Sequence, residues 1–308
     1  MKYLPILISL LVCLSCSGQQ KKKEEGQEKK IPVFEMVTIP SLVTDPQHRM
    51  EYAVEHYWDK FNFTDTAYIH HPEVTEQAFS NYLYMMGEVP LEKAVSSIRN
   101  MLKKAEVEKQ MYTYFTDLFE KYLYDPNAPL RNEELYIPVL QAMVETPLLD
   151  EVNKIRPAHL LEVALRNRLG ESATDFVYEL PDGKKGRLYQ VKSDYLLLYF
   201  YNPDCENCRE VTQAMKESQL INGLLNAGKL KVLSVYPDED KEAWVNHIPQ
   251  MPTVWINGQD REVILKNEEI YDLKAIPCLY LLDKNKTVVL KDAPFEQVEA
   301  YLYNHSAI

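Results

Sequence analysis

Cysteine is scarce in this chain, which has five cysteines in 308 residues. That number is too small for a domain held together mainly by disulfides. Basic charge is in deficit as well, because 46 acidic residues outnumber 34 lysines and arginines and give a net charge of −12. An acidic chain repels the phosphate backbone, so we exclude nucleic acid as a partner.

A long hydrophobic run is also missing. The apolar stretch at residues 4–12 is about half as long as the roughly 20 residues that a membrane-spanning helix needs. It follows Lys2 and ends in small residues, which is the pattern of an export signal. We therefore predict a signal peptide at residues 1–16. Residues 17–33 are polar and lack aromatic side chains, so we expect a flexible tether.

The end of the signal contains the pair Ser15-Cys16. It resembles the lipobox of bacterial lipoproteins, in which the cysteine is acylated. Cys13 stands where an aliphatic residue is usual and is a rival acceptor, and a plain secretory signal is the alternative. The resemblance implies a lipid anchor at Cys16 and a place in the bacterial cell envelope, facing the periplasm.

Residues 34–168 have the periodicity of helices. Apolar side chains form stripes over residues 91–105 and 111–123, and Asn132 stands where a helix N-cap is expected. A further helix is predicted from Pro157, with Gly170 suited to its end. The sequence therefore predicts an all-α N-terminal domain.

The helical part contains no convincing chemical motif. His56, His70 and His71 lack a cysteine or carboxylate at metal-ligand spacing, so we predict no metal. The tyrosine-rich stripe of this part is interpreted as core, with a ligand groove as the alternative.

The period changes in residues 169–308. Strands alternate with helices there, which predicts an α/β domain. The expected elements are a hairpin turning at Asp182-Gly183, strands at 195–201 and 229–236, a helical pattern from the cysteine pair to 225, a short helix at 240–248, a possible strand at 253–258, a helical turn at 268–275, a hairpin at 278–290 and a last helix at 294–305. The fold class is therefore α+β with two domains, the helical one first.

Two cysteines, Cys205 and Cys208, directly follow the apolar strand at 195–201. A helix N-terminus at this point would stabilise the Cys205 thiolate. The three-residue spacing would let Cys208 attack a mixed disulfide at Cys205. Half of a zinc site is the alternative, but it needs two more ligands and Cys278 is the one further thiol outside the signal.

Strand, CxxC, helix, strand and Ile-Pro before a hairpin and a final helix together resemble the thioredoxin fold, in its TlpA/ResA-like envelope branch. The resemblance covers residues 169–308, and residues 34–168 are similar to a helical domain of unknown function that precedes such modules. The resemblance to the thioredoxin fold implies a thiol-disulfide oxidoreductase that needs no cofactor. Its partners would be protein thiols and disulfides of the envelope, and an electron donor that the sequence does not identify.

The family places a cis-proline against the cysteine pair. Pro252 and Pro277 compete for this role, and we favour Pro277 because an uninterrupted hairpin and one terminal helix follow it. Cys278 comes next in the chain, where the family usually has threonine. It is interpreted as an inert buried thiol, and a third exchanging thiol is the alternative.

Three residues near the pair depart from the family pattern. Tyr199 aligns with the buried acid that assists proton transfer in the family, so the sequence identifies no residue for that role. Asp204 and Glu206 flank Cys205, and like charge disfavours its thiolate. We therefore expect a reductase or an isomerase-like enzyme rather than a strong oxidant.

Two other functions were weighed. Peroxiredoxins share the fold, but their motif requires threonine or serine three residues before the cysteine and proline seven before it. Asn202 and Leu198 stand at those positions, so the motif is absent. A non-catalytic envelope lipoprotein that binds a partner or glycan through its helical domain remains the alternative.

Overall fold

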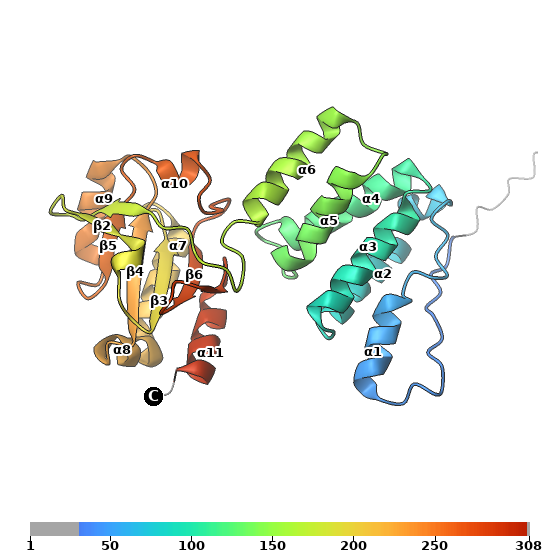
Figure 1. Ribbon diagram of the computed structural model, residues 1–308, viewed down its shortest axis with the longest axis horizontal. Coiled ribbons are helices and arrows are strands. Elements are labelled where there is room, and N and C mark those ends of the chain that lie inside the picture. Colours follow the sequence, from blue (N-terminus) through green and yellow to red (C-terminus); the bar gives the residue numbers. More distant parts are fainter. Residues whose placement is uncertain (1–30, 307–308) are drawn as a thin grey trace, which may run out of the picture.

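The computed structural model describes residues 31–306 and shows a helical region followed by an α/β region. The two regions lie side by side along the long axis of the molecule, and α5 and α6 are on the side of the helical region toward the sheet (Figure 1). The helical elements are α1 (Pro46–Glu55), η1 (Thr66–His70), α2 (Pro72–Met86), α3 (Leu91–Ala105), α4 (Lys109–Phe119), η2 (Glu120–Tyr124), α5 (Glu133–Glu145) and α6 (Glu151–Ala164).

Side-chain caps begin the last two of these helices. The Asn132 carboxamide accepts a hydrogen bond from the backbone N–H of Leu135 at 3.2 Å, so the predicted cap of α5 is confirmed. Asp150 caps α6 in the same way, and this helix therefore begins at Glu151 rather than at Pro157, which lies inside it. Sequence reasoning had treated the proline as the start of the helix.

One aromatic-rich cluster forms the core of the helical region. Trp58 lies at its centre, with ring centroids 5.2 Å from Phe61 and 5.1 Å from Phe115, both in edge-to-face geometry. Such pairs stabilise a core beyond the area that they bury. Phe115 belongs to the stripe at residues 111–123 and is fully buried, so the interpretation of that stripe as core is confirmed at this residue.

The α/β region is built on a seven-stranded sheet with strand order β2-β1-β5-β4-β3-β6-β7. β3 pairs in parallel with β4 and antiparallel with β6, where Phe200 lies opposite Cys278. The elements are β1 (Val177–Glu179), β2 (Lys185–Arg187), η3 (Leu188–Gln190), β3 (Tyr195–Phe200), α7 (Glu206–Glu217), α8 (Gln219–Asn226), β4 (Leu230–Tyr236), α9 (Lys241–His247), η4 (Ile248–Gln250), β5 (Ile256–Gln259), α10 (Ile264–Asn267), β6 (Cys278–Asp283), β7 (Val288–Leu290) and α11 (Phe295–His305).

The strand β3 is buried on both faces, as its continuous apolar run predicts. Leu197 and Tyr199 face a core shared with α7, α8, α9 and α11. Leu196, Leu198 and Phe200 face a second core formed with the segment before β3 and with residues near α10. β3 therefore contacts a separate apolar layer on each face of the sheet.

Two predicted elements differ from the structure. The single helix predicted after the cysteine pair is divided in two at Ser218. The Ser218 hydroxyl accepts a hydrogen bond from the backbone N–H of Ile221 and so caps the second helix, α8. Residues 268–275 contain no helix, and a short helix lies just before them, at Ile264–Asn267. The hairpin predicted at Asp182-Gly183 is confirmed, with Gly183 at the positive φ of 82° that its turn requires.

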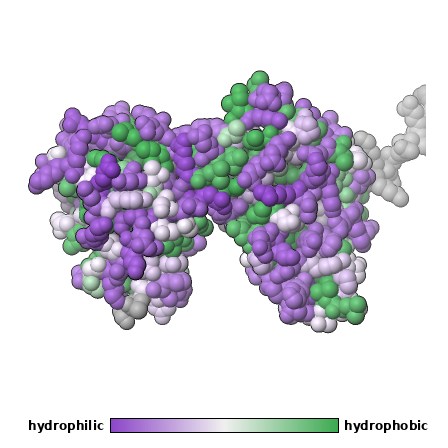
Figure 2. Space-filling view, viewed as in Figure 1, coloured by the Kyte–Doolittle hydropathy of each residue, from purple (hydrophilic) through white to green (hydrophobic). Residues whose placement is uncertain are grey.

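The signal peptide, Cys16 and nearly all of the tether fall outside the described residues, as does Cys13. Within residues 31–306, no helix is long and apolar enough to cross a membrane. Most of the visible surface is hydrophilic (Figure 2). A hydrophobic patch lies over the upper end of the helical region, where α6 exposes Val152 and Ile155.

Candidate functional site

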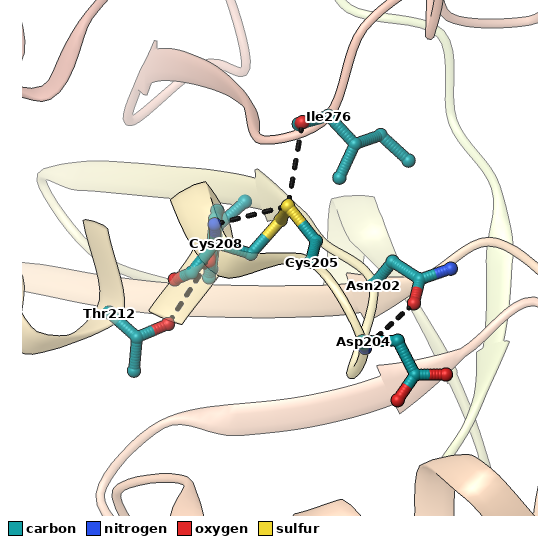
Figure 3. The surroundings of a disulfide bond; sticks show 7 residues. Asn202, Asp204, Cys205, Cys208, Thr212 and Ile276 are labelled. Atoms are coloured by element: carbon teal, nitrogen blue, oxygen red, sulfur yellow. Dashed lines mark hydrogen bonds between the residues drawn. A yellow bond between two sulfur atoms is a disulfide. The ribbon is translucent and has the colours of Figure 1, made fainter. Parts of the chain in front are cut away.

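The cysteine pair lies where β3, an inner strand of the sheet, passes into a helix. β3 ends at Phe200, and Cys205 is the N-cap residue of α7. The two cysteines form a disulfide with 5.2 Å between their Cα atoms. The backbone N–H of Cys208 points at the Cys205 sulfur from 3.1 Å, as Figure 3 shows. The first turn of α7 therefore directs a donor at the sulfur atom that would carry negative charge.

The two sulfur atoms differ in access to solvent. Cys205 is partly exposed, whereas Cys208 is 2% exposed and packs into the core below α7. An incoming disulfide can reach Cys205 but not Cys208. This asymmetry is what a nucleophile and a resolving thiol need.

The loop that precedes β6 approaches the Cys205 sulfur. The carbonyl oxygen of Ile276 lies 3.6 Å from the Cys205 sulfur (Figure 3). The peptide bond between Ile276 and Pro277 is cis, so the structure places this bond at the second of the two competing prolines. Sequence reasoning placed Pro277 at this site, and the structure brings it next to the residue that contacts Cys205.

Tyr199 lies beneath the pair and is fully buried. Its hydroxyl donates to the Cys208 carbonyl oxygen at 2.8 Å, and the Thr212 hydroxyl is 3.0 Å from the same phenol oxygen. Burial raises the pKa of Tyr199 far above neutrality, so it stays protonated. Tyr199 therefore anchors the first turns of α7 and does not replace the acid of the family.

The acidic neighbours of Cys205 are exposed. The backbone N–H of Asp204 donates to the Asn202 side chain at 2.9 Å, and Figure 3 shows the Asp204 carboxylate pointing away from the sulfur atoms. Glu206 occupies the first turn of α7 and is exposed as well. Both carboxylates are solvated, so their electrostatic effect on Cys205 is screened.

A cavity of about 180 Å³ adjoins Cys208 on the flank of α7. Arg209, Thr212 and His247 contribute to its wall. His247 is 9% exposed, and burial lowers its pKa, with a smaller opposing effect from Asp204 and a further lowering effect from Arg209. Sequence reasoning missed this histidine, because no motif marks the last residue of α9.

Cys278 does not join the pair. Its side chain is fully buried in the second core, on the face of the sheet opposite the layer that holds Cys205 and Cys208. Its sulfur lies 3.7 Å from the carbonyl oxygen of Asp272, and burial raises the pKa of the thiol well above its ordinary value. Strand alternation predicts that Cys278 shares a face with Ile276, two residues before it. This prediction is wrong, since Ile276 packs against the layer of the pair.

Two of the histidines singled out in the helical region have carboxylate partners near in sequence. His56 contacts Asp59 at 2.7 Å and His71 contacts Glu73 at 2.9 Å. Between residues 31 and 306, no group of three or more histidine, cysteine or acidic side chains is arranged to hold a metal ion.

The chain matches known families in both regions. Residues 13–167 match a domain of unknown function (DUF5106), and residues 193–288 match a thioredoxin-like family. A thioredoxin-like protein from Bacteroides caccae is 48% identical, with a TM-score of 0.88 over 90% of this chain and 100% of its own. No curated protein matches the chain.

Two shorter solved structures resemble the C-terminal region. The C-terminal domain of an uncharacterized protein from Bacteroides fragilis is 52% identical, with a TM-score of 0.44 over 44% of this chain and 98% of its own. A thiol-disulfide oxidoreductase from the same species is 22% identical, with a TM-score of 0.39 over 44% of this chain and 98% of its own. The likeness to the Bacteroides caccae protein over 90% of this chain, together with the match of residues 13–167, shows that the chain belongs to the thioredoxin-like proteins and carries this N-terminal domain of unknown function.

Proposed function

We propose that the protein is a thiol-disulfide oxidoreductase, acting as a reductase or an isomerase-like exchanger. The observation that carries the proposal is the asymmetry of the pair at the N-terminus of α7. Cys205 is accessible and faces the N–H of Cys208, while Cys208 is buried within bonding distance. Cys205 is therefore the nucleophile and Cys208 the resolving thiol.

The reaction proceeds from the reduced pair in two exchanges. The Cys205 thiolate attacks one sulfur of a substrate disulfide, a mixed disulfide forms, and the other substrate sulfur leaves as a thiolate that takes up a proton. Cys208 then loses its proton and attacks the Cys205 sulfur, which releases the second substrate thiol. Two electrons pass to the substrate, and a dithiol donor of the envelope must return two to the Cys205–Cys208 disulfide.

Pro277 and its neighbour shape the place where the substrate docks. The Ile276 carbonyl stands 3.6 Å from the Cys205 sulfur, so a substrate chain that reaches Cys205 passes along this loop. A backbone carbonyl beside the reacting sulfur is suited to accept a hydrogen bond from an extended peptide. This supports protein disulfides, rather than small peroxides, as the substrate class.

The direction of transfer follows from charge. Asp204 and Glu206 flank Cys205 and disfavour its thiolate, which favours a reductant or exchanger over a strong oxidant. The replacements Asp204→Asn and Glu206→Gln together should lower the Cys205 pKa by less than about one unit, because both carboxylates are solvated. An iodoacetamide titration of Cys205 measures this change, and a thiolate already formed near pH 5 in the wild type would contradict a reductant.

We also propose that Cys16 is acylated and tethers the protein to the envelope, facing the periplasm. The support is the Ser15-Cys16 pair after the apolar stretch. Wild type should fractionate with membranes, whereas Cys16→Ala should not mature normally. Wild type that is wholly soluble, with an unmodified Cys16, would rule this proposal out.

The activity is tested with the purified chain, a protein disulfide and a chemical reductant. Wild type should catalyse reduction, and Cys205→Ser should abolish it. The matched control is Cys278→Ser, which removes a buried thiol on the opposite face of the sheet and should retain activity if the protein folds. Equal rates in wild type and Cys205→Ser would favour the non-catalytic alternative.

A further inference from the structure

The helical region contacts the α/β region at two segments on either side of β6. The first segment, residues 268–274, leads to the Ile276 carbonyl that faces Cys205. Arg166 donates to the carbonyl oxygens of Glu268 and Glu269 at 2.5 and 2.7 Å, and Asn167 donates to that of Ile270 at 2.6 Å. The segment that approaches the reactive sulfur is thus hydrogen-bonded to residues just after α6.

Among these contacts, Lys274 is nearest in sequence to Ile276, the residue that contacts Cys205. Its side chain is 16% exposed, forms an ion pair with Asp272 and lies 4.8 Å from the centroid of the Tyr124 ring, which belongs to η2 of the helical region. Burial lowers the pKa of Lys274, but the Asp272 and Glu133 carboxylates outweigh this effect and raise it overall. The lysine is therefore a partly buried cation held between the two regions.

The second segment, Lys291–Asp292, follows β7. Arg131 forms an ion pair with the Asp292 carboxylate at 2.9 Å and also donates a hydrogen bond to the backbone carbonyl oxygen of Asp292 at 2.8 Å. Lys291 pairs with Glu133 at 2.5 Å. The next residue, Ala293, donates from its backbone N–H to the Leu279 carbonyl oxygen at 3.1 Å, so this contact reaches β6 as well. Both ends of the β6–β7 hairpin are fixed to helical residues.

The loop that carries Ile276 is bounded by two buried residues, and Leu273 and Ile276 within it pack against the two cores of the α/β region. Tyr271 is buried and donates to the Thr174 carbonyl at 2.7 Å, and Cys278 is buried at the start of β6. Between these anchors, residues 272–277 are only partly buried and have no helix or strand. Lys274 is in the middle of this stretch, two residues before Ile276. Its contact with Tyr124 therefore restricts the part of the loop that has no regular structure.

We propose that Lys274 and Tyr124 are positioning residues, through which the helical region holds the Ile276 carbonyl in place beside Cys205. This inference rests on the proposed function and gives the helical region a role in it. A docked substrate chain needs the loop in one position, and a loop that must first be ordered binds the chain more weakly. The effect acts on substrate binding and not on the intrinsic reactivity of the Cys205 sulfur.

The kinetic test uses the full chain with Lys274→Met and Tyr124→Leu. Each should raise KM for a protein disulfide about fivefold or more, within the usual range of coupling between sites, with kcat changed less. The double variant should be no worse than the more affected single variant, because both changes remove the same contact. Lys274→Arg and Tyr124→Phe keep a cation and a ring and should retain most of the binding.

Lys241→Met is the matched control. Lys241 pairs with Glu179 at 2.8 Å, within the α/β region, so its replacement removes a lysine ion pair without touching the helical region. It should leave KM within about twofold of the wild type, as surface ion pairs contribute little. An equal rise in KM for Lys241→Met, or none for Lys274→Met, would overturn the inference.

A second measurement does not depend on activity. Native-state hydrogen exchange of the amides at 273–279 should be faster in Lys274→Met than in wild type, while the amides of β4 should be unchanged. Unchanged exchange at 273–279 would overturn the positioning role even if the enzyme is active. An inactive wild type with faster exchange in the variant would instead refute the proposed function and leave the positioning of the loop standing.

Discussion

The helical region and the α/β region both bury many aromatic side chains, but they use them differently. In the helical region, Trp58 and its aromatic neighbours pack against one another in a single hydrophobic core. In the α/β region, Tyr199 packs below α7 and also binds the backbone of Cys208. The same residue types thus stabilise one region and additionally support a reactive pair in the other.

The difference follows from architecture. A helix satisfies its own backbone, so the helical core consists mainly of apolar side chains, with a few buried hydroxyl groups, such as those of Tyr82 and Ser97, that hydrogen-bond to each other. A parallel pair of strands ends at an edge where the chain must turn into a helix, and the free N–H groups of that helix face whatever lies there. The reactive cysteine of this protein occupies that position, as the N-cap of α7.

Removing the centre of the helical core should have the largest effect on stability. Trp58 is 3% exposed, and Trp58→Ala should lower the free energy of unfolding by roughly 3–5 kcal/mol. Chemical denaturation measures this loss. Tyr84 is 63% exposed, so Tyr84→Ala should cost less than about 0.5 kcal/mol. Similar losses for the two variants would contradict a core centred on Trp58.

A smaller effect is expected at the contact between the regions. Arg131→Met leaves the Asp292 carboxylate without its ion-pair partner and should cost about 1–3 kcal/mol at neutral pH. Burial raises the pKa of Asp292, an effect that Arg131 opposes. Without Arg131 the folded-state pKa rises further, so the loss should shrink as the pH falls and the carboxyl becomes neutral. A loss that grows in acid would contradict this assignment.

Two buried tyrosines of the α/β region, Tyr199 and Tyr280, lie on opposite faces of the sheet. Replacing each by phenylalanine distinguishes the contribution of the hydroxyl hydrogen bond from that of ring packing. Tyr199→Phe removes the donor to the Cys208 carbonyl and should cost about 0.5–1.5 kcal/mol. The Tyr280 hydroxyl is buried with no hydrogen-bond partner among the described residues, so Tyr280→Phe should be neutral or stabilising. Thermal unfolding measures both. No loss for Tyr199→Phe would show that its hydroxyl has no supporting role, and a loss for Tyr280→Phe would show that the hydroxyl of Tyr280 has a partner after all.

The smallest effect concerns His247 beside Cys208. Burial lowers its folded-state pKa below the ordinary value of 6.5. The unfolded chain therefore binds a proton first as the pH falls, and wild type loses stability below about pH 6.5. His247→Gln lacks this contribution, so its stability relative to wild type should improve by less than about 1 kcal/mol between pH 7.5 and 5. Parallel pH profiles for the two proteins would show that His247 titrates normally.

Local signals in the sequence predict much of this structure. The apolar run of β3, the turn at Gly183 and the cap at Asn132 each act over a few residues, and all three are found. The position of Cys205 at a strand-to-helix junction follows from the same kind of signal. These features need no knowledge of distant parts of the chain.

Features that depend on distant contacts could not be predicted. The segment 268–275 looks helical by composition, but Tyr271 is instead buried against the sheet and Lys274 against the helical region. The face occupied by Cys278 depends on how the chain enters β6, and strand alternation alone predicts the wrong face. The ion pair of Arg131 and Asp292 joins residues that are 161 positions apart, so no local sequence pattern predicts it.

The most direct test of the account is to trap the first exchange at Cys205. Cys208→Ser should form a stable mixed disulfide with a protein disulfide substrate, and mass spectrometry of the cross-linked peptides should place the bond at Cys205. Cys205→Ser should form none, although it keeps Cys208 and Cys278. A bond to Cys278 in Cys208→Ser, or a stable adduct in Cys205→Ser, would contradict the assignment of Cys205 as the nucleophile.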